Sequence, residues 1–202
     1  MKIALIDYGI GNLRSVQKAL EHVGATVALT EDADTILAAD KVVLPGVGAF
    51  GDGMKGLRAR GLDGVVREVV RRGTPLLGIC VGMQVLFEAS DELGLHVGLG
   101  LLPGRVVRFA PRQLKVPHTG WNEIATLQSS NLFRDLPSGS FAYFNHSYYC
   151  AAAPEHTLAA TDYGEPFASV VGRGRLYGIQ FHPEKSQSVG LMLLRNFVTT
   201  QP

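Results

Sequence analysis

A cysteine placed between two glycines at the end of an apolar run is the first feature of this chain that could do chemistry. The run Thr74 to Ile79 predicts a short buried strand, and Met83 to Ser90 predicts a helix. Cys80 therefore lies on a sharp strand-to-helix turn, whose strained backbone needs small neighbours such as Gly78 and Gly82. A nucleophile elbow has this geometry, and the start of a helix favours the thiolate form of a cysteine. The alternative is an ordinary buried cysteine, which is common in protein cores.

A second segment, near the carboxyl end of the chain, supplies the groups that a thiol nucleophile needs. His182 and Glu184 are two residues apart, so in extended backbone their side chains lie on one face. A carboxylate beside an imidazole fixes the tautomer of the ring and stabilises its charged form, which lets the ring take a proton from a thiol. Cys80, His182 and Glu184 are therefore predicted to be the nucleophile, the base and the orienting carboxylate.

The glycine-rich turn from Pro45 to Gly48 predicts an oxyanion-binding turn. Attack of a thiol on an amide carbonyl produces an oxygen anion, which must be held by rigid backbone donors. One predicted donor is the amide of Val81, directly after the nucleophile, and the other is the amide of Val47 in this turn. An ordinary glycine turn is the alternative. Because the glycines beside Val47 permit a peptide flip, we hypothesise that this donor is correctly aimed only when a partner or ligand is bound.

The same turn also carries a formal G-x-G-x-x-G pattern from Gly46 to Gly51, as dinucleotide-binding folds do. Three features argue against that interpretation. The pattern follows the third predicted strand and not the first, and Gly53 and Gly56 weaken the helix that would receive a pyrophosphate. The next strand ends in Cys80, where a ribose-binding acid would be expected. Nucleotide binding is therefore not predicted.

The elements that position these residues change character along the chain. Apolar residues from Leu62 to Arg72 recur at i, i+3, i+4, i+7 and i+8, which is typical of an amphipathic helix. In the first half, strands are predicted at residues 3–7, 26–30 and 41–44, and a further helix at 13–23, capped by Asn12 and ended by Gly24. The second half consists of short β-like runs and a closing helix at 189–198; the runs are 105–109, 123–127, 141–149, 157–161, 167–172 and 175–181.

This order of elements predicts a three-layer α/β fold over residues 1–202, in a single domain. Alternating strands and helices imply a mostly parallel central sheet with helices on both faces, and the second half adds an antiparallel β region before returning to the sheet with His182. Ligands of such sheets bind at the carboxyl ends of the strands. Cys80, His182 and the turn after Pro45 each end a predicted strand, so they are expected to converge there.

Composition excludes several classes of protein. The 19 basic and 18 acidic residues give a net charge of +1, which provides no electrostatic reason to expect binding to nucleic acid or to an anionic membrane. Two cysteines, Cys80 and Cys150, are too few for a disulfide scaffold and suit a reducing compartment. The apolar run Ile3 to Ile6 is too short for a signal peptide or a membrane span, so we expect a cytoplasmic protein. The histidines lack metal-ligand spacing, and no metal or cofactor is predicted.

With these segments assembled, the chain resembles the class I (triad) glutamine amidotransferases, and in finer detail the glutaminase subunits of imidazole glycerol phosphate synthases. The matching segments cover nearly the whole chain in the order of the family: 7–13, 45–50, 78–84, 120–122, 145–148 and 180–186. Gly-Val-Gly after Pro45 and the Gly-Trp-Asn segment favour this particular subunit. Thr119 departs from the methionine that the family usually has, which affects only the local packing of that segment.

The resemblance implies hydrolysis of L-glutamine to glutamate and ammonia through a thioester on Cys80. Ammonia then passes, shielded from water, to a (β/α)₈-barrel cyclase subunit in histidine biosynthesis, so the chain is expected to work in a heterodimer. The resemblance also implies that glutamine is held by a set of four residues: Gly48, Gln84, Ser147 and Tyr148. It assigns four residues to the interface with the cyclase: Asn12, Trp121, Asn122 and Lys185.

Several alternatives stay open on the residues alone. Gln84 is also consistent with an exposed helix residue, and Trp121, predicted in a loop, with a core residue. His146 lies in an aromatic strand and is predicted to be structural, while Cys150 is predicted to be an inert core thiol. Other functions to weigh are the glutaminase subunit of another biosynthetic amidotransferase, a cysteine-dependent hydrolase of esters or peptides, and a binding subunit with an inactive triad. The intact triad and its glycines argue against the last.

Overall fold

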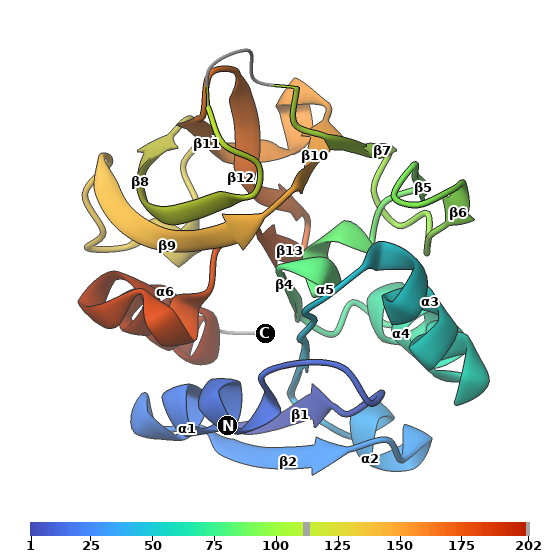
Figure 1. Cartoon of the computed structure of the whole chain (residues 1–202). Helices are drawn as coiled ribbons and strands as arrows, with labels where there is room; N and C mark the ends of the chain where they lie inside the picture. Colours follow the sequence, from blue (N-terminus) through green and yellow to red (C-terminus); the bar gives the residue numbers. More distant parts are fainter. Residues whose placement is uncertain (111–113, 201–202) are drawn as a thin grey trace.

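The computed structural model describes residues 1–110 and 114–200, and its largest element is one nine-stranded sheet with the order β2-β1-β3-β4-β13-β12-β11-β8-β9 (Figure 1). One half is parallel and consists of β2 (Thr26–Thr30), β1 (Lys2–Ile6), β3 (Lys41–Leu44), β4 (Leu76–Ile79) and β13 (Leu176–Ile179). The other half is antiparallel and consists of β12 (Pro166–Arg173), β11 (Thr157–Asp162), β8 (His118–Thr126) and β9 (Ser140–His146). The predicted α/β fold with an antiparallel region in the second half is confirmed.

A second, four-stranded sheet lies beside the antiparallel half. Its strands, in spatial order, are β10 (Tyr148–Ala152), β7 (Gly104–Arg108), β5 (Ala89–Ser90) and β6 (His96–Val97). The run predicted as one strand at 141–149 is therefore divided at Ser147 between two sheets. Ser147 is the corner where the chain leaves one sheet for the other, and its carbonyl accepts a hydrogen bond from the amide of Phe109 at 3.1 Å.

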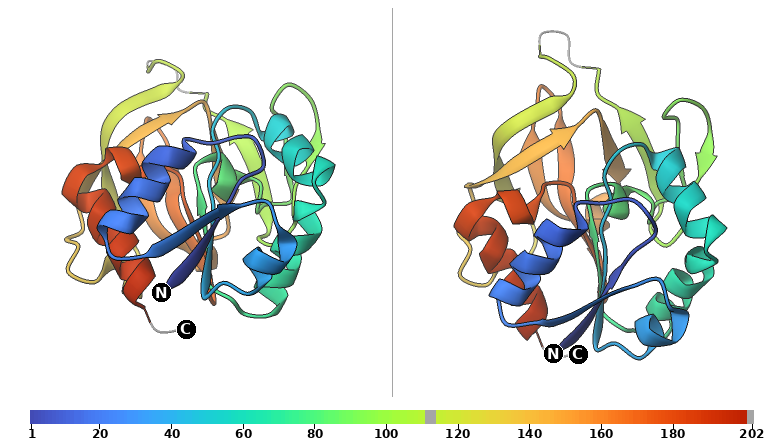
Figure 2. Two further views of the ribbon diagram at one scale, coloured as in Figure 1. Left: turned by 90° about the horizontal axis from the view of Figure 1, so that it is seen from below. Right: turned by 60° about the horizontal axis from the view of Figure 1, so that its bottom comes forward.

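Helices cover both faces of the parallel half, as Figure 2 shows. On one face α1 (Leu13–His22) contacts α6 (Gln187–Thr199), and on the other α4 (Leu62–Arg71) contacts both α2 (Ala33–Leu37) and α3 (Phe50–Ala59). The remaining helical elements are short: α5 (Val81–Gln84), η1 (Asn131–Phe133), η2 (Pro154–His156) and η3 (Pro183–Lys185). None of the helices in the described ranges combines the length and apolar character that crossing a bilayer requires.

The helix predicted at Met83–Ser90 is wrong in its extent. The helix after Cys80 is α5, which ends at Gln84, and the chain then turns into β5. The carbonyls of residues 85–87 accept hydrogen bonds from amides of residues 99–102 and so do not continue the helical pattern. Residues 83–87 are all buried, so this stretch has no exposed face whose period would distinguish a helix from a folded loop.

Another correction concerns Gly53 and Gly56, which were expected to weaken the helix after the glycine-rich turn. That segment is α3, a regular helix. A Cβ at Gly56 would lie 2.7 Å from the carbonyl oxygen of Tyr8, and one at Gly53 would lie 3.1 Å from Cγ1 of Val81. These glycines therefore serve close packing of α3 against its neighbours. The other two arguments against a dinucleotide site are unaffected.

Two further predictions were wrong in local detail. Trp121 lies within β8, which begins at His118, and not in a loop before a strand at 123–127. Asn12 does precede α1, but its side chain makes no capping hydrogen bond. Only its backbone carbonyl acts there, accepting hydrogen bonds from the amides of Ser15 and Val16 at 3.1 Å each.

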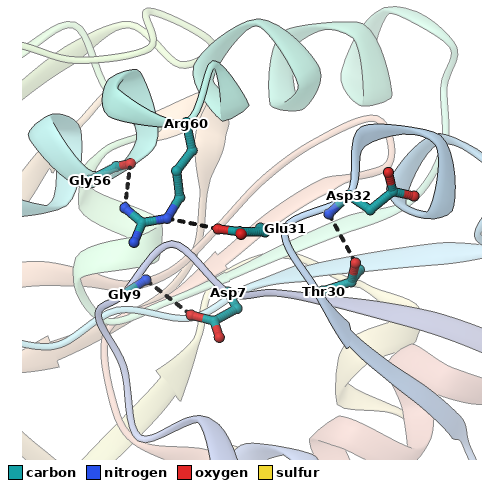
Figure 3. A network of polar contacts seen from close by, with 7 residues as sticks. All are labelled: Asp7, Gly9, Thr30, Glu31, Asp32, Gly56 and Arg60. Atoms are coloured by element: carbon teal, nitrogen blue, oxygen red, sulfur yellow. Dashed lines mark hydrogen bonds and ion pairs between the residues drawn. The ribbon is translucent and has the colours of Figure 1, made fainter.

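Polar contacts fasten the loops at the carboxyl edge of the parallel strands (Figure 3). Arg60, directly after α3, pairs with Glu31 at 2.9 Å and reaches the carbonyl of Gly56 at 3.4 Å. Its guanidinium lies against Gly9, where a Cβ would be 3.1 Å from Nη2, and the amide of Gly9 donates to Asp7 at 3.0 Å. The loop after β1 is thus packed against the side chain of Arg60, which comes from a distant segment of the chain.

Candidate active site

The carboxyl ends of three neighbouring strands in the parallel half lie side by side. Gly78 of β4 is in register with Gly178 of β13 and with Leu44 of β3. The segments that follow these strands contain Cys80, His182 and the turn after Pro45. The amide of Cys80 donates to the carbonyl of Ile179 at 2.8 Å, which ties the nucleophile directly to the neighbouring strand. The convergence expected from strand ends is confirmed.

The backbone at Cys80 is strained, as an elbow requires. Its φ of 54° and ψ of −113° lie in a region that residues with a Cβ rarely adopt. A Cβ at Gly82 would lie 1.9 Å from the carbonyl oxygen of Leu44, and one at Gly78 would lie 2.6 Å from the carbonyl oxygen of Gly82. Both flanking positions therefore have no room for any side chain, and the elbow packs directly onto the end of β3.

The imidazole of His182 connects the sulfur with a carboxylate. Its Nδ1 lies 3.1 Å from Oε1 of Glu184, and the two side chains are only 6% and 1% exposed. The side chain of Cys80 lines the same cavity as this ring. Burial alone lowers the pKa of His182, but the hydrogen bonds and charges of Cys80 and Glu184 outweigh it and raise the pKa to about 10. The charged form of the ring is therefore favoured.

The loop that carries His182 is fixed to β9 by a buried serine. Ser186 donates its hydroxyl to the carbonyl of His182 at 2.7 Å, and the same hydroxyl accepts a hydrogen bond from the amide of Tyr143 at 3.0 Å. The amide of His182 also donates to the carbonyl of Tyr143 at 2.9 Å. Sequence reasoning did not single out Ser186. A polar residue two positions after the triad glutamate is the only signal for it in the sequence.

A cavity of about 130 Å³ opens onto the nucleophile and the base. Its wall contains Cys80 and His182, and also every residue predicted to bind the oxyanion or glutamine: Val47, Gly48, Val81, Gln84, Ser147 and Tyr148. Val81 is the first residue of α5, and the amide of a first helical residue has no partner within its helix. The cavity wall therefore combines the elbow and the glycine turn with the corner between β9 and β10.

Sequence reasoning missed two groups in the cavity wall and one that supports the turn after Pro45. Glu92, from the loop after β5, lies in the wall and accepts a hydrogen bond from the amide of Phe50 at 2.7 Å. Asn145 lies in the wall as well. Tyr8, from the first loop, donates its hydroxyl to the carbonyl of Pro45 at 2.6 Å. Burial, together with the charge of Cys80, raises the pKa of Tyr8, so it remains a neutral donor that holds the turn.

Gln84 is 3% exposed, which rules out the alternative of a solvated helix residue. Its Nε2 donates to the carbonyl of Tyr148 and to Oε1 of Gln180, both at 3.1 Å. Both hydrogens of that nitrogen are therefore used within the protein. His146 also lies in the wall, although it was predicted to be structural, and Cys150 is fully buried in β10.

The residues assigned to a partner interface fall into two groups. Trp121 is 47% exposed, which excludes core packing, and its ring meets that of Tyr143 edge-on at 6.2 Å. Lys185, which also lines the cavity, places Nζ 5.6 Å from the centre of the Tyr143 ring. Trp121, Tyr143 and Lys185 thus form one surface cluster beside the cavity. Asn122 instead turns its amide to the carbonyl of Asp162 at 2.8 Å, and Asn12 lies at the start of α1.

A family model described as glutamine amidotransferase class-I matches residues 4–200. This chain belongs to that family. Among curated proteins it is similar to the imidazole glycerol phosphate synthase subunit HisH of Methanosarcina barkeri, with 53% identity and 98% of each chain covered. It is also similar to the HisH subunit of Moorella thermoacetica, with 52% identity over 96% of this chain and 93% of the relative.

Solved structures agree on the fold of this class I glutamine amidotransferase. PurLQS from Thermotoga maritima superposes with a TM-score of 0.75 at 18% identity, covering 98% of this chain and 97% of the other. The glutaminase domain of CTPS from Trypanosoma brucei, with bound acivicin, gives a TM-score of 0.68 at 16% identity, covering 98% and 91%. As a member of this family, the chain is a glutamine-hydrolysing enzyme.

Proposed function

We propose that this amidotransferase is the glutaminase subunit of an imidazole glycerol phosphate synthase, which hydrolyses L-glutamine and delivers the ammonia to a cyclase subunit. The observation that carries the glutaminase chemistry is that Cys80 and His182 line one small cavity while Glu184 holds the other side of the His182 ring. The choice of synthase is supported by the named HisH relatives, which match over nearly the whole of both chains.

The triad geometry gives each proton transfer a defined route. Because Nδ1 of His182 faces Glu184, its Nε2 is left to hold the proton that Cys80 gives up, so we propose that a thiolate beside the charged ring is the reactive state. The sulfur then attacks the carboxamide carbon of glutamine, and the amides of Val81 and Val47 are the proposed donors to the oxyanion; losing one such donor costs about 3–4 kcal/mol of transition-state stabilisation. As the C–N bond breaks, His182 returns the proton to the leaving nitrogen and ammonia departs. Water, deprotonated by His182, hydrolyses the thioester to release glutamate.

The cavity wall suggests how glutamine is oriented. Glu92 provides a carboxylate in the cavity wall, which suits the α-ammonium group of an amino acid. Gly48, Ser147 and Tyr148 are the proposed further contacts, and Gln84 can offer glutamine only its Oε1. A volume of about 130 Å³ suits a ligand as small as a single amino acid.

The partner is proposed to be a (β/α)₈-barrel cyclase, docked over the cluster of Trp121, Tyr143 and Lys185 beside the cavity, with Asn12 and Asn122 at the periphery. Docking there would cover the cavity and keep ammonia from water. The turn at Val47 is exposed and contains Gly48 at φ +87°, so a change of peptide orientation on docking remains our hypothesis. We expect this heterodimer to work in the cytoplasm, without a cofactor or metal.

The experiment that tests this function measures ammonia release from glutamine with and without the barrel subunit. Release that depends on Cys80, with covalent labelling of Cys80 by an electrophilic glutamine analogue, is the expected result. Turnover of esters or peptides in place of glutamine would favour the cysteine hydrolase, and an unlabelled Cys80 would favour a binding subunit. Equal rates with and without the partner would contradict the hypothesis for the turn at Val47.

A further inference from the structure

A line of hydrogen bonds that the triad chemistry does not use ends at the nucleophile. Gln180, fully buried at the end of β13, places Nε2 3.7 Å from Sγ of Cys80 as a donor. The Oε1 of Gln180 accepts a hydrogen bond from Nε2 of Gln84 at 3.1 Å. A primary amide can turn over by 180° and exchange its nitrogen with its oxygen. The contact with Gln84 fixes Gln180 in the one orientation that presents N–H groups, and not an oxygen, to the sulfur.

The orientation of Gln84 is fixed in turn by a backbone carbonyl. The second hydrogen of its Nε2 goes to the carbonyl of Tyr148 at 3.1 Å, and the same carbonyl accepts a hydrogen bond from Nδ1 of His146 at 2.8 Å. A carbonyl can only accept, so both groups that face it must donate. If Gln84 turned over, its oxygen would face the carbonyl of Tyr148 and the oxygen of Gln180, and two repulsive contacts would replace two hydrogen bonds.

A pair of buried histidines continues the line from the Tyr148 carbonyl. Because Nδ1 of His146 donates, its Nε2 must accept, and Nδ1 of His118 lies 3.2 Å from it as the donor. Nε2 of His118 then accepts from Nδ2 of Asn122 at 3.3 Å. The other hydrogen of Asn122 goes to the carbonyl of Asp162, and its Oδ1 accepts from the amide of Glu123 at 2.8 Å. Every group in the line therefore has only one arrangement of protons.

This arrangement requires both histidines to be neutral, and their surroundings keep them so. Burial lowers the pKa of His118 to about 4 and that of His146 to about 3, and the nearby charge of His182 opposes a charge on His146 as well. His118 also stacks on Tyr163, with ring centres 4.0 Å apart, so its ring plane is fixed by packing. Neutral rings each carry a single N–H, so each histidine donates one hydrogen bond and accepts one.

We propose that Gln180 is a positioning residue that donates a hydrogen bond to the thiolate of Cys80, and that the His118–His146 pair, acting through the Tyr148 carbonyl and Gln84, keeps its amide from turning over. This inference rests on the proposed glutaminase function. It gives Gln84 a role besides the substrate contact that its family position implies. It also places Asn122, assigned above to the partner face, as the fixed end of an interior network.

The first test replaces Gln180 by Met, which keeps the length of the side chain and removes the amide. A hydrogen bond to a charged group corresponds to a factor of about 10–100 in rate. We therefore expect kcat for glutamine hydrolysis by the assembled heterodimer to fall about 10–100-fold, while KM changes less than about 3-fold. Alkylation of Cys80 by iodoacetamide, followed by mass spectrometry of its peptide, should slow by a similar factor. Gln128→Met is the matched control, since Gln128 also donates two internal hydrogen bonds.

The second test separates hydrogen bonding from packing at the histidine pair. His146→Leu removes the donor to the Tyr148 carbonyl and should lower kcat and the Cys80 alkylation rate by a smaller factor, about 3–10-fold. His146→Asn can place an amide nitrogen where Nδ1 was, so it should recover most of both rates. His22→Leu, an exposed histidine on α1, serves as the control.

Unchanged kcat and unchanged alkylation in Gln180→Met would overturn the inference, as would His146→Asn being as slow as His146→Leu. If Gln180→Met does not fold, Gln180→Glu replaces it in both measurements and is expected to slow them for the same reason. The alkylation rate requires no glutamine turnover. A wild-type protein that fails to hydrolyse glutamine but shows the expected alkylation differences would therefore contradict the proposed function and leave this inference standing.

Discussion

The two halves of the central sheet are built from different kinds of strand and make different contributions to the site. In the parallel half, β3 and β4 are buried at all four positions, and their ends deliver the glycine turn and the nucleophile. In the antiparallel half, β8 alternates between buried, half-buried and exposed positions and carries Trp121 on one face and His118 on the other. The first half holds the reacting groups on rigid strand ends, and the second contributes the His118–His146 pair inside and the exposed Trp121 outside.

This difference separates the positions that carry out the reaction from those that modulate its rate or the binding of a partner. Strands that are buried on both faces leave no freedom in where their ends lie, so the elbow and the base are fixed by register. A sheet with one exposed face can place polar groups inside and aromatic groups outside on the same strand. Substitutions in the parallel half should therefore abolish catalysis or destabilise the fold, whereas those in the antiparallel half should adjust rate or affinity.

The largest expected effect separates the two cysteines, one at the end of the parallel half and one in the neighbouring four-stranded sheet. Cys80→Ala should lower glutaminase activity by about 10⁴-fold or more, since the nucleophile is lost. Cys150→Ala, in β10, should leave kcat within about 2-fold and cost about 1 kcal/mol of unfolding free energy for the lost buried volume. Burial raises the pKa of the Cys150 thiol well above its ordinary value, so it stays protonated. Steady-state ammonia release checks both variants, and a comparable loss from Cys150→Ala would contradict the assignment.

Glu184→Gln should have the next largest effect on rate, with kcat reduced by about 10²–10⁴-fold because the orientation and charge of His182 are no longer supported. It should also change the pH dependence of stability. The folded pKa of His182, about 10, lies above its unfolded value of about 6.5. The stability gained from its charge is therefore fully present below about pH 6.5 and is lost as the pH rises through about 10.

Removing the carboxylate lowers the folded pKa of His182, so the gap in unfolding free energy between the wild type and Glu184→Gln should narrow as the pH rises from 6 to 10. Urea unfolding across that range measures the gap. Glu155→Gln, an exposed glutamate on η2, is the control and should show no such narrowing. A gap that stays constant with pH would mean that Glu184 does not raise the pKa of His182.

A pair of glycines tests how tightly the parallel half is packed. Gly82→Ala places a Cβ 1.9 Å from the carbonyl oxygen of Leu44, so β3 must move and the unfolding free energy should fall by about 2–4 kcal/mol. Gly64→Ala, on the open face of α4, meets nothing within 4 Å and should stabilise by about 0.5–1 kcal/mol. Denaturant unfolding gives both values. A neutral Gly82→Ala would show that the elbow tolerates displacement.

The smallest effect is expected on the exposed face of the antiparallel half. Trp121→Ala should weaken binding of the barrel subunit by about 30-fold, or roughly 2 kcal/mol, with little change in stability. Leu127→Ala is the control, because Leu127 is also exposed but lies just beyond the far end of β8. Titration calorimetry measures both affinities. Equal affinities for wild type and Trp121→Ala would remove this residue from the interface.

Much of the parallel half could be predicted from short-range patterns. The strands at 26–30 and 41–44 were predicted with their observed limits, since continuous β-branched and apolar runs between turn signals leave few alternatives. The helix at Leu62–Arg71 was predicted to within one residue from its 3.6-residue period. The extent of α5 was predicted wrongly, because residues 83–87 are all buried and show no amphipathic period.

The order and spacing of residues determined by themselves that a thiol, an imidazole and a carboxylate would meet at strand ends, because backbone geometry and the rules of parallel sheets fix where such ends lie. Only the tertiary structure decided which polar groups surround them. Glu92, Gln180 and the His118–His146 pair come from separate segments, and their roles depend on distances between side chains. No local pattern encodes those distances, since each one is set by the packing of several elements at once.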